Sequence, residues 1–227
     1  MTITMPSACQ AVLFDLDGTL ADTAPDLASA LNETLRFYGK ETLPFDTIRP
    51  HVSHGGRALI KLAFGYDSDH SSYAAAREVF LNHYATHIAK QTRLFDGMPS
   101  LLDTLEQSAI PWGIVTNKPA YLTDPLVALL GLAPRAGCVV SGDTTAHSKP
   151  HPAPLLHACS ELGVKPQHCL YIGDAERDIE AGRLAGMTTL VALFGYIGEW
   201  DDPRQWGADG LVASPTEIFD WIKAWQQ

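Results

Sequence analysis

Short runs of apolar, mostly branched residues recur along the chain, at residues 11–14, 112–115, 138–140, 169–172, 189–192 and 210–212. Uninterrupted apolar runs of this length are typical of strands buried on both faces. Most of the later runs are separated by helical patterns, at residues 100–107, 121–130, 154–162 and 179–185. Strands that alternate with helices predict a parallel sheet covered on both sides. We therefore expect an α/β fold, a Rossmann-like, doubly wound parallel sheet. A capping box at residues 214–217 predicts one further helix at the end of the chain.

The stretch between the first two predicted strands is too long for a single crossover helix. Helices are expected at residues 25–37, 56–64 and 73–88, with Thr23 and Asp26 as capping residues at the first of them. Several helices without a strand predict an α-helical cap domain inserted into the core. We place the cap at residues 22–94 and the core at residues 1–21 and 95–227, with hinges near Asp22 and Phe95.

Composition narrows the function. The chain has 227 residues, 46% of them hydrophobic, and a formal net charge of −10. The acidic balance argues against a general binder of nucleic acid or of anionic membranes. No apolar stretch is long enough to span a bilayer, and residues 1–6 lack the pattern of a secretory signal. Cys138 and Cys169 lie in apolar runs without CxxC spacing, which predicts buried thiols. We expect a cytoplasmic protein, monomeric or homodimeric.

Polar residues follow four of the predicted strands, three of them directly and Lys149 after a loop of several residues. They are, in chain order, Asp15 and Asp17, then Thr116 and Asn117, then Lys149, then Asp174 and Asp178. In an open parallel sheet, ligands bind at the carboxyl ends of the strands, so these side chains are expected to converge on one crevice.

This set of side chains suits a phosphate and a metal ion. Gathered carboxylates repel one another, and a hard divalent cation with oxygen ligands, such as magnesium, relieves the repulsion. Thr116 offers a hydroxyl group and Lys149 a positive charge for a phosphate. Asp178 lies one helical turn after Asp174, so it could ligate the metal or orient a ligand from behind. The alternative for this pair is an acidic cluster at the start of a helix.

The order of these motifs resembles that of the haloacid dehalogenase-like phosphatases. The likeness rests on DLDGTL at residues 15–20, Thr116, Lys149, and GDAERD at residues 173–178. It implies that Asp15 is a nucleophile forming an aspartyl-phosphate and that Asp17 is the general acid and base. It also implies that Thr116, Asn117 and Lys149 hold the phosphoryl group. By the same resemblance, Mg²⁺ is bound by Asp15, the backbone carbonyl of Asp17, and Asp174, with Asp178 in support.

The place of the insert resembles that in the phosphoglycolate phosphatase, phosphoglucomutase and dehalogenase branches of this family. The dehalogenases lack an aspartate matching Asp17, which argues against carbon–halogen cleavage. Residues 20–27, 116–119 and 194–196 resemble the phosphoglycolate phosphatases. Residues 94–98, 112–119, 195–197 and 206–209 resemble the N-acetylmuramic acid 6-phosphate phosphatases. Two alternatives stay open. One is a phosphosugar mutase, because the mutases share both aspartates, and the other is a phosphate-binding module without catalysis.

The cap is expected to select the substrate. Residues 53–57 are interpreted as a loop in which Gly56 permits close approach and Arg57 grips a carboxylate; the alternative is a helix start with an exposed arginine. His51 and His54 are expected to be solvated loop residues, and Trp200 and Trp206 to pack under a loop. Together with these residues, the resemblance implies a magnesium-dependent phosphomonoesterase that acts on a small phosphorylated metabolite, with 2-phosphoglycolate or N-acetylmuramic acid 6-phosphate as the leading substrates.

Overall fold

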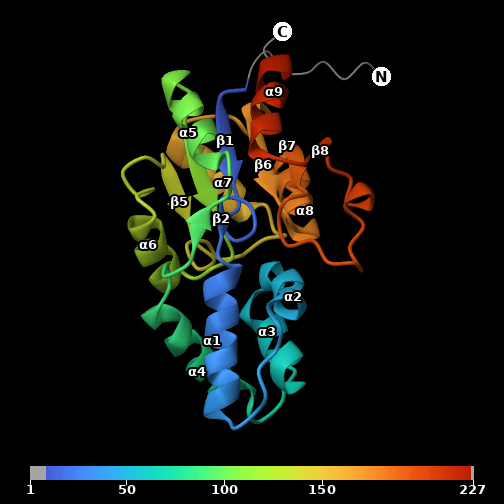
Figure 1. The fold of residues 1–227 in the computed structure, drawn as a ribbon. Helices are drawn as coiled ribbons and strands as arrows, with labels where there is room; N and C mark the ends of the chain where they lie inside the picture. Colours follow the sequence, from blue (N-terminus) through green and yellow to red (C-terminus); the bar gives the residue numbers. More distant parts are fainter. Residues whose placement is uncertain (1–8, 226–227) are drawn as a thin grey trace.

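Six parallel strands form the central sheet, in the order β5-β4-β1-β6-β7-β8 (Figure 1). Their bounds are β1 Ala11–Phe14, β4 Trp112–Val115, β5 Cys138–Val140, β6 Cys169–Gly173, β7 Thr188–Ala192 and β8 Gly210–Val212. The structure is a computed structural model that describes residues 9–225. All six predicted strands are present, and β1 lies between β4 and β6, where the strand order reverses. This confirms the predicted doubly wound α/β core.

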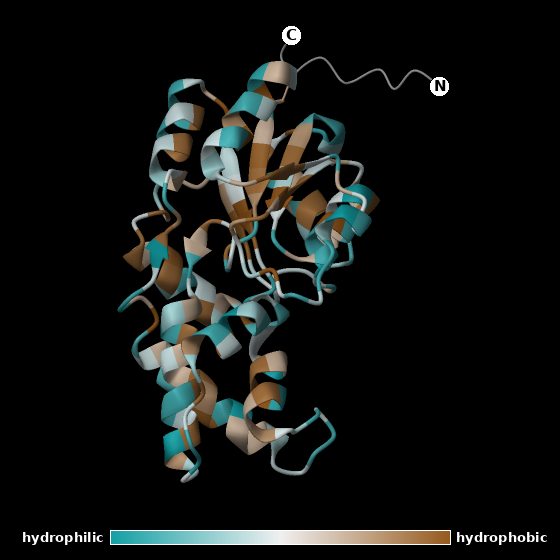
Figure 2. Cartoon of the chain, turned by 45° about the vertical axis from the view of Figure 1, so that its right-hand side comes forward, coloured by the Kyte–Doolittle hydropathy of each residue, from teal (hydrophilic) through white to brown (hydrophobic). Residues whose placement is uncertain are grey.

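Helices cover both faces of the sheet. One face carries α5 (Met98–Gln107), α6 (Ala120–Leu129) and α9 (Pro215–Trp225), and the other carries α7 (Ala153–Leu162) and α8 (Glu176–Ala185). Successive side chains of a strand point to opposite faces. Accordingly Val12 and Phe14 of β1 join the core under the first set, whereas Ala11 and Leu13 join the core under the second. The strands are brown along most of their length in Figure 2, as expected for a sheet buried on both sides.

A separate group of helices lies beyond the carboxyl ends of the strands (Figure 1). It contains α1 (Ala24–Phe37), α2 (Phe45–Ile48), the 3₁₀ helix η1 (Arg49–His54), α3 (Gly55–Phe64) and α4 (Tyr73–Thr86). Helices α1 and α4 pack along each other. The interpretation of residues 53–57 as a loop is wrong. Gly55, with a φ of +77°, joins η1 directly to α3, so that these residues form the end of one helix and the start of the next.

A two-stranded antiparallel ribbon connects these helices to the core. It consists of β2 (Ala21–Asp22) and β3 (Arg93–Leu94), with Ala21 paired to Leu94 and Asp22 paired to Arg93. The boundaries that the sequence places at residues 21/22 and 94/95 fall in this ribbon. We propose it as the hinge between core and cap.

Asp26 anchors the returning chain rather than capping α1. Its buried carboxylate accepts hydrogen bonds from the backbone N–H groups of Gln91 and Thr92 and from the Thr92 hydroxyl, at 2.8–3.0 Å. Thr23 is the N-cap residue of α1, but its hydroxyl makes no capping hydrogen bond. Neither side chain therefore has the predicted capping role: the Thr23 hydroxyl bonds to Asp17, six residues away, and Asp26 bonds to a segment distant in sequence.

The predictions for the remaining aromatic and sulfur-containing residues are confirmed in part. The thiols of Cys138 and Cys169 are buried and free. Trp206 is buried against Ile179, as expected, whereas Trp200 is 58% exposed and its ring lies 4.7 Å from that of His51.

Two short 3₁₀ helices, η2 (Pro166–His168) and η3 (Pro203–Gln205), complete the described elements. Helix α9 begins near its predicted start, and the Glu217 carboxylate accepts a hydrogen bond from the backbone N–H of Ala213, one residue before the expected donor. Over residues 9–225, none of the helices has the length and apolar character that crossing a membrane requires. Residues 1–6, in which the sequence predicts no secretory signal, lie outside the described part of the chain. The cytoplasmic location and the oligomeric state stay predictions.

Candidate active site

The register of the sheet brings three of the predicted site residues to one edge. Phe14 of β1 is paired with Ile114 of β4 and with Ile172 of β6. Continued by one residue, this register sets Asp15 level with Val115 and Gly173, and Thr116 and Asp174 follow directly at the ends of β4 and β6. The convergence expected from the sequence is present.

This edge opens onto a cavity of about 670 Å³ between the sheet and the cap helices. Eight of the nine predicted site residues line it: Asp15, Asp17, Gly56, Arg57, Thr116, Asn117, Lys149 and Asp178. Asp174 instead lines a smaller neighbouring cavity of about 200 Å³, together with Ser53 and Arg177.

Lys149 is the positive centre of the site. Its side chain is 2% exposed, and its ammonium group lies 2.7 Å from Oδ1 of Asp15 and 2.7 Å from Oδ1 of Asp178. It also donates hydrogen bonds of 2.8 Å to the backbone carbonyl of Val115 and to the Tyr171 hydroxyl. Burial lowers the pKa of Lys149, but the two carboxylates outweigh burial and raise it above its ordinary value. Lys149 is therefore held as a cation beside Asp15.

Asp178 is fully engaged by the protein. Besides its ion pair with Lys149, Oδ1 accepts a 3.2 Å hydrogen bond from the Tyr171 hydroxyl. Its Oδ2 accepts a 3.1 Å hydrogen bond from the backbone N–H of Ala175, which satisfies one donor at the start of α8. Asp178 therefore serves both as an acidic residue at a helix start and as a member of the site.

Three buried carboxylates could hold a metal ion. Among the described residues, one oxygen each of Asp15, Asp174 and Asp178 lie within 4.8 Å of one another. Burial raises the pKa of Asp15, the ammonium group of Lys149 lowers it, and repulsion by Asp178 and Asp17 raises it again. The net result is a pKa of about 6. Burial and the neighbouring carboxylates raise the pKa of Asp174 to about 8. Such an arrangement disfavours the ionised carboxylates until a cation joins them.

The two oxygens of Asp174 differ in their surroundings. Oδ2 accepts hydrogen bonds from the Ser53 hydroxyl at 2.6 Å and from the backbone N–H of Tyr196 at 2.8 Å. Oδ1 is buried and has no hydrogen-bond partner within residues 9–225. An unpartnered buried carboxylate oxygen carries a large desolvation penalty, and a divalent cation is the partner that fits it.

Asp17 is held from two directions. Its Oδ1 accepts a 2.6 Å hydrogen bond from the Thr23 hydroxyl and lies 2.8 Å from the ammonium group of Lys118. Lys118 in turn donates a 2.9 Å hydrogen bond to the hydroxyl of Tyr84, on α4 of the cap. Thr23 and Lys118 therefore fix one oxygen of Asp17 at the edge of the cavity.

Thr116 and Asn117 differ in what their side chains do. Thr116 is 2% exposed, and its hydroxyl accepts a 3.1 Å hydrogen bond from the backbone N–H of Lys118. The Asn117 side chain pairs with both backbone groups of Lys149, at 2.9 Å each. Asn117 thereby fixes the loop that carries Lys149.

Ser53 and His54 of the cap contact the core beside the site. Arg177, on α8, donates hydrogen bonds to the carbonyl of Ser53 and, at 3.0 Å, contacts Nδ1 of His54. Arg57 is exposed at the cavity wall in the first turn of α3. His51 and His54 lie in η1 rather than in a loop, and His54 is paired with Arg177 instead of being only solvated.

The comparisons with known proteins agree with this geometry. The family model described as haloacid dehalogenase-like hydrolase matches residues 12–192. The chain belongs to this family. A haloacid dehalogenase-like family protein from Streptococcus pneumoniae, 22% identical, has the same fold, with a TM-score of 0.80 over 94% of this chain and 98% of that one.

Two relatives extend over nearly the whole chain. A phosphoglycolate phosphatase from Xanthomonas campestris pv. campestris is 45% identical over 96% of this chain and 98% of its own length. An N-acetylmuramic acid 6-phosphate phosphatase from Pseudomonas aeruginosa is 43% identical over 93% of each chain. These likenesses confirm the predicted haloacid dehalogenase-like family and the class of enzyme, a phosphatase-type hydrolase.

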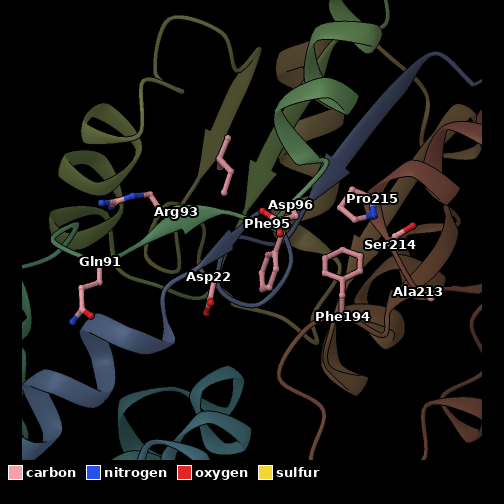
Figure 3. Close-up of a pocket in the computed structure, with 10 residues that line it drawn as sticks. Asp22, Gln91, Arg93, Phe95, Asp96, Phe194, Ala213, Ser214 and Pro215 are labelled. Carbon is pink, nitrogen blue, oxygen red and sulfur yellow. The ribbon is translucent and has the colours of Figure 1, made fainter.

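A second cavity, of about 420 Å³, lies at the ribbon between core and cap (Figure 3). Asp15, Asp174 and Asp178 do not line it. Phe95 and Phe194 approach each other there, with ring centroids 5.2 Å apart. Asp22 and Arg93 of the ribbon also line it. Its place makes it part of the connection between the two groups of elements.

Several residues of the site were not found from the sequence. Lys118 follows Thr116 by two residues in a stretch that resembles the family, so a signal for it was present. Ser53 lies in the segment singled out as a cap loop, but its contact with Asp174 depends on how the cap docks. For Tyr84 and Tyr171 the sequence gives no signal, because a tyrosine in an apolar run is most simply a core residue.

Proposed function

We propose that this enzyme hydrolyses the phosphomonoester of a small, carboxylate-bearing metabolite, with Asp15 as the nucleophile. One observation carries the proposal. Asp15 is buried at the end of β1 with the Lys149 ammonium at 2.7 Å, and it opens onto the large cavity beside Asp17. A carboxylate held next to a fixed positive charge can attack a phosphorus atom whose negative oxygens that charge also attracts.

The reaction proceeds in two steps. An oxygen of Asp15 attacks phosphorus, the bond between phosphorus and the ester oxygen breaks, and Asp17 gives its proton to the departing alcohol. Asp17 then takes a proton from a water molecule that attacks the aspartyl-phosphate, which releases phosphate and restores Asp15. Thr116 and Lys149 hold the phosphoryl oxygens, and Asn117 keeps the Lys149 loop in place.

The site fits magnesium. We assign its ligands to Asp15, Asp174 and the backbone carbonyl of Asp17, and the unpartnered Oδ1 of Asp174 supports this choice. Asp178 supports the site without ligating the ion directly, because its oxygens are already bonded to Lys149, Tyr171 and Ala175. When bound, the ion would offset the negative charge of the phosphate oxygens.

The cavity supports a substrate larger than a two-carbon acid. Its volume of about 670 Å³ lies in the range of sites that enclose a molecule of sugar size. Arg57 and Arg77 line its cap side and can pair with a carboxylate. Of the two compounds named for the relatives, N-acetylmuramic acid 6-phosphate fills such a cavity better than 2-phosphoglycolate.

The test is phosphate release, with and without Mg²⁺, from 2-phosphoglycolate, N-acetylmuramic acid 6-phosphate and common hexose phosphates. We expect one carboxylated substrate to exceed the others by orders of magnitude in kcat/KM. We expect Asp15→Asn to abolish turnover while thermal unfolding stays cooperative. Isomerised phosphosugar with little free phosphate would replace the proposal by a mutase. Ligand binding without hydrolysis at any magnesium concentration would replace it by a binding module.

A further inference from the structure

Lys118 is a second buried cation in the site, distinct from Lys149. Its side chain is 7% exposed, and its ammonium group contacts two partners, one in the core and one in the cap. One is Oδ1 of Asp17 in the core, at 2.8 Å, and the other is the hydroxyl of Tyr84 in the cap, at 2.9 Å. The ammonium also lies 4.6 Å from the centroid of the Tyr84 ring, within the range of a cation–π contact.

These contacts determine which oxygen of Asp17 is available. Oδ1 receives both Lys118 and the Thr23 hydroxyl, on two sides. Within residues 9–225, no hydrogen bond reaches Oδ2, although Asp17 lines the cavity. The carboxylate is therefore clamped by one oxygen and presents the other to whatever occupies the cavity.

Lys118 has its own partners and does not duplicate Lys149. The ammonium group of Lys149 is occupied by Asp15, Asp178, Val115 and Tyr171. Lys118 contacts neither Asp15 nor Asp178 and instead bridges Asp17 to α4. Since Tyr84 is 1% exposed and belongs to the cap, this bridge exists only while the cap is docked on the core.

We propose that Lys118 is a positioning residue that turns Oδ2 of Asp17 toward the leaving-group oxygen, and that Tyr84 makes this orientation depend on the docked cap. The inference rests on the proposed function, in which Asp17 is the general acid. It adds a residue that acts through Asp17, and it links cap docking to proton transfer.

The inference predicts an effect that depends on the leaving group. An alkoxide leaves with difficulty unless a well-placed acid protonates it, whereas p-nitrophenolate leaves readily without one. Loss of Lys118 should therefore impair hydrolysis of alkyl phosphates far more than hydrolysis of p-nitrophenyl phosphate. A role in binding phosphate, or in folding, would impair both substrates alike.

The experiment measures kcat and KM for the best alkyl phosphate of the panel and for p-nitrophenyl phosphate. In Lys118→Met we expect kcat for the alkyl substrate to fall about 100-fold, which is the size of effect expected when a general acid is misplaced. We expect kcat for p-nitrophenyl phosphate to fall less than about tenfold, because its leaving group needs little help from an acid. Lys118→Arg should recover part of the alkyl activity, because a guanidinium can still bond Asp17. Lys61→Met, an exposed lysine of α3, is the matched control.

Tyr84→Phe provides the second test if Lys118→Met does not fold. It removes only the hydroxyl that accepts from Lys118, and we expect a loss of about three- to tenfold with the same preference for the alkyl substrate. Tyr121→Phe, whose ring is 58% exposed on α6, is its control.

Three outcomes would overturn the inference. Equal loss on both substrates would make Lys118 a phosphate ligand or a structural residue. A rise in KM with kcat unchanged would make it a binding residue. If the unaltered enzyme releases phosphate from neither substrate, the proposed function itself fails, which the first two outcomes do not imply.

Discussion

The side-chain hydroxyl of Ser53, in the cap, donates a 2.6 Å hydrogen bond to Oδ2 of Asp174, at the end of β6 in the core. Arg177 holds the backbone carbonyl of the same serine from α8. A proposed metal ligand is thus oriented in part by the cap. Its other oxygen, Oδ1, is the one that stays without a partner within the described residues.

Ser53→Ala should weaken magnesium binding. Without the hydroxyl, Asp174 loses one of the two bonds that fix Oδ2, and loss of an outer partner of a metal ligand typically costs about 10- to 100-fold in affinity. The concentration of Mg²⁺ that gives half-maximal activity, together with calorimetric titration of Mg²⁺, measures the effect. Ser71→Ala, on the exposed surface of the cap, is the control. An unchanged magnesium affinity would show that Ser53 does not orient this ligand.

The metal-free protein should lose stability as pH rises. The pKa of Asp15 is raised to about 6 and that of Asp174 to about 8, both from 3.8. Between pH 3.8 and these raised values the folded state binds more protons than the unfolded state, so the free energy of unfolding contributed by these groups falls with rising pH. Their stabilising contribution is fully present below about pH 4 and is lost as the pH rises through about 6 for Asp15 and about 8 for Asp174. Thermal unfolding in EDTA across this range measures the loss.

Two comparisons isolate the groups responsible for the pH dependence. Asp174→Asn should flatten the decline between pH 6 and 8, because Asp174 is the group that titrates there. Saturating Mg²⁺ should restore stability at pH 8 in the unaltered protein, since the ion compensates the ionised carboxylates. A decline of the same slope in Asp174→Asn would assign the pH dependence to other residues.

Gly18→Ala should impair the active site through a steric clash, in addition to the backbone strain that it introduces. Gly18 has a φ of +89°, and a Cβ there would lie 2.1 Å from Oδ2 of Asp174. Gly131 has a φ of +71° with nothing within 4 Å, so Gly131→Ala carries the strain without the clash. We expect each variant to lose about 1 kcal/mol through strain and only Gly18→Ala to lose about 100-fold or more in kcat/KM. Similar activity in the two variants would contradict this.

Asp26→Ala should destabilise the protein without touching the cavity. The carboxylate of Asp26 is 3% exposed and holds the backbone N–H groups of Gln91 and Thr92, which its removal leaves unpaired. We expect the free energy of unfolding to fall by about 3 kcal/mol. Denaturant unfolding measures it, with the exposed Asp46→Ala as the control. A change within the error of the control would show that water replaces these bonds.

Arg57→Gln should raise KM for a carboxylated substrate more than for p-nitrophenyl phosphate. The arginine is exposed at the cap wall of the cavity, so its pairing with a carboxylate contributes about 1.4 kcal/mol, or about tenfold in KM. Arg36→Gln, on the outer surface of α1, is the control. A KM that rises equally for both substrates would place Arg57 at the phosphate instead.

Much of the core could be predicted from the sequence because each strand is a short apolar run and three of the four catalytic motifs follow one directly, Lys149 being the exception. Asp15, Thr116 and Asp174 meet because the register of β1, β4 and β6 brings them to within one residue of the same level, a consequence of parallel topology rather than of any single residue. The ribbon strands escaped prediction since each has two residues, too few to show a period.

The contacts across the cap could not be predicted. Ser53 and Tyr84 meet their partners in the core only when α4 and η1 dock on the sheet edge, and nothing local in the chain sets that docking. The misassigned caps of α1 have a different cause, since Asp26 is bound by the returning chain at Gln91 and Thr92. A local pattern assigned Thr23 to its own helix, whereas in the fold its hydroxyl bonds to Asp17.

The ribbon has a further consequence for the history of such enzymes. Because Ala21 and Leu94 are paired neighbours, the chain departs from the core and returns to it at almost the same point. Changes in the length of the inserted segment therefore leave Asp15 where β1 puts it. Recognition of new metabolites can therefore evolve by changes in the insert, as long as the contacts that Ser53 and Tyr84 make with the core are kept.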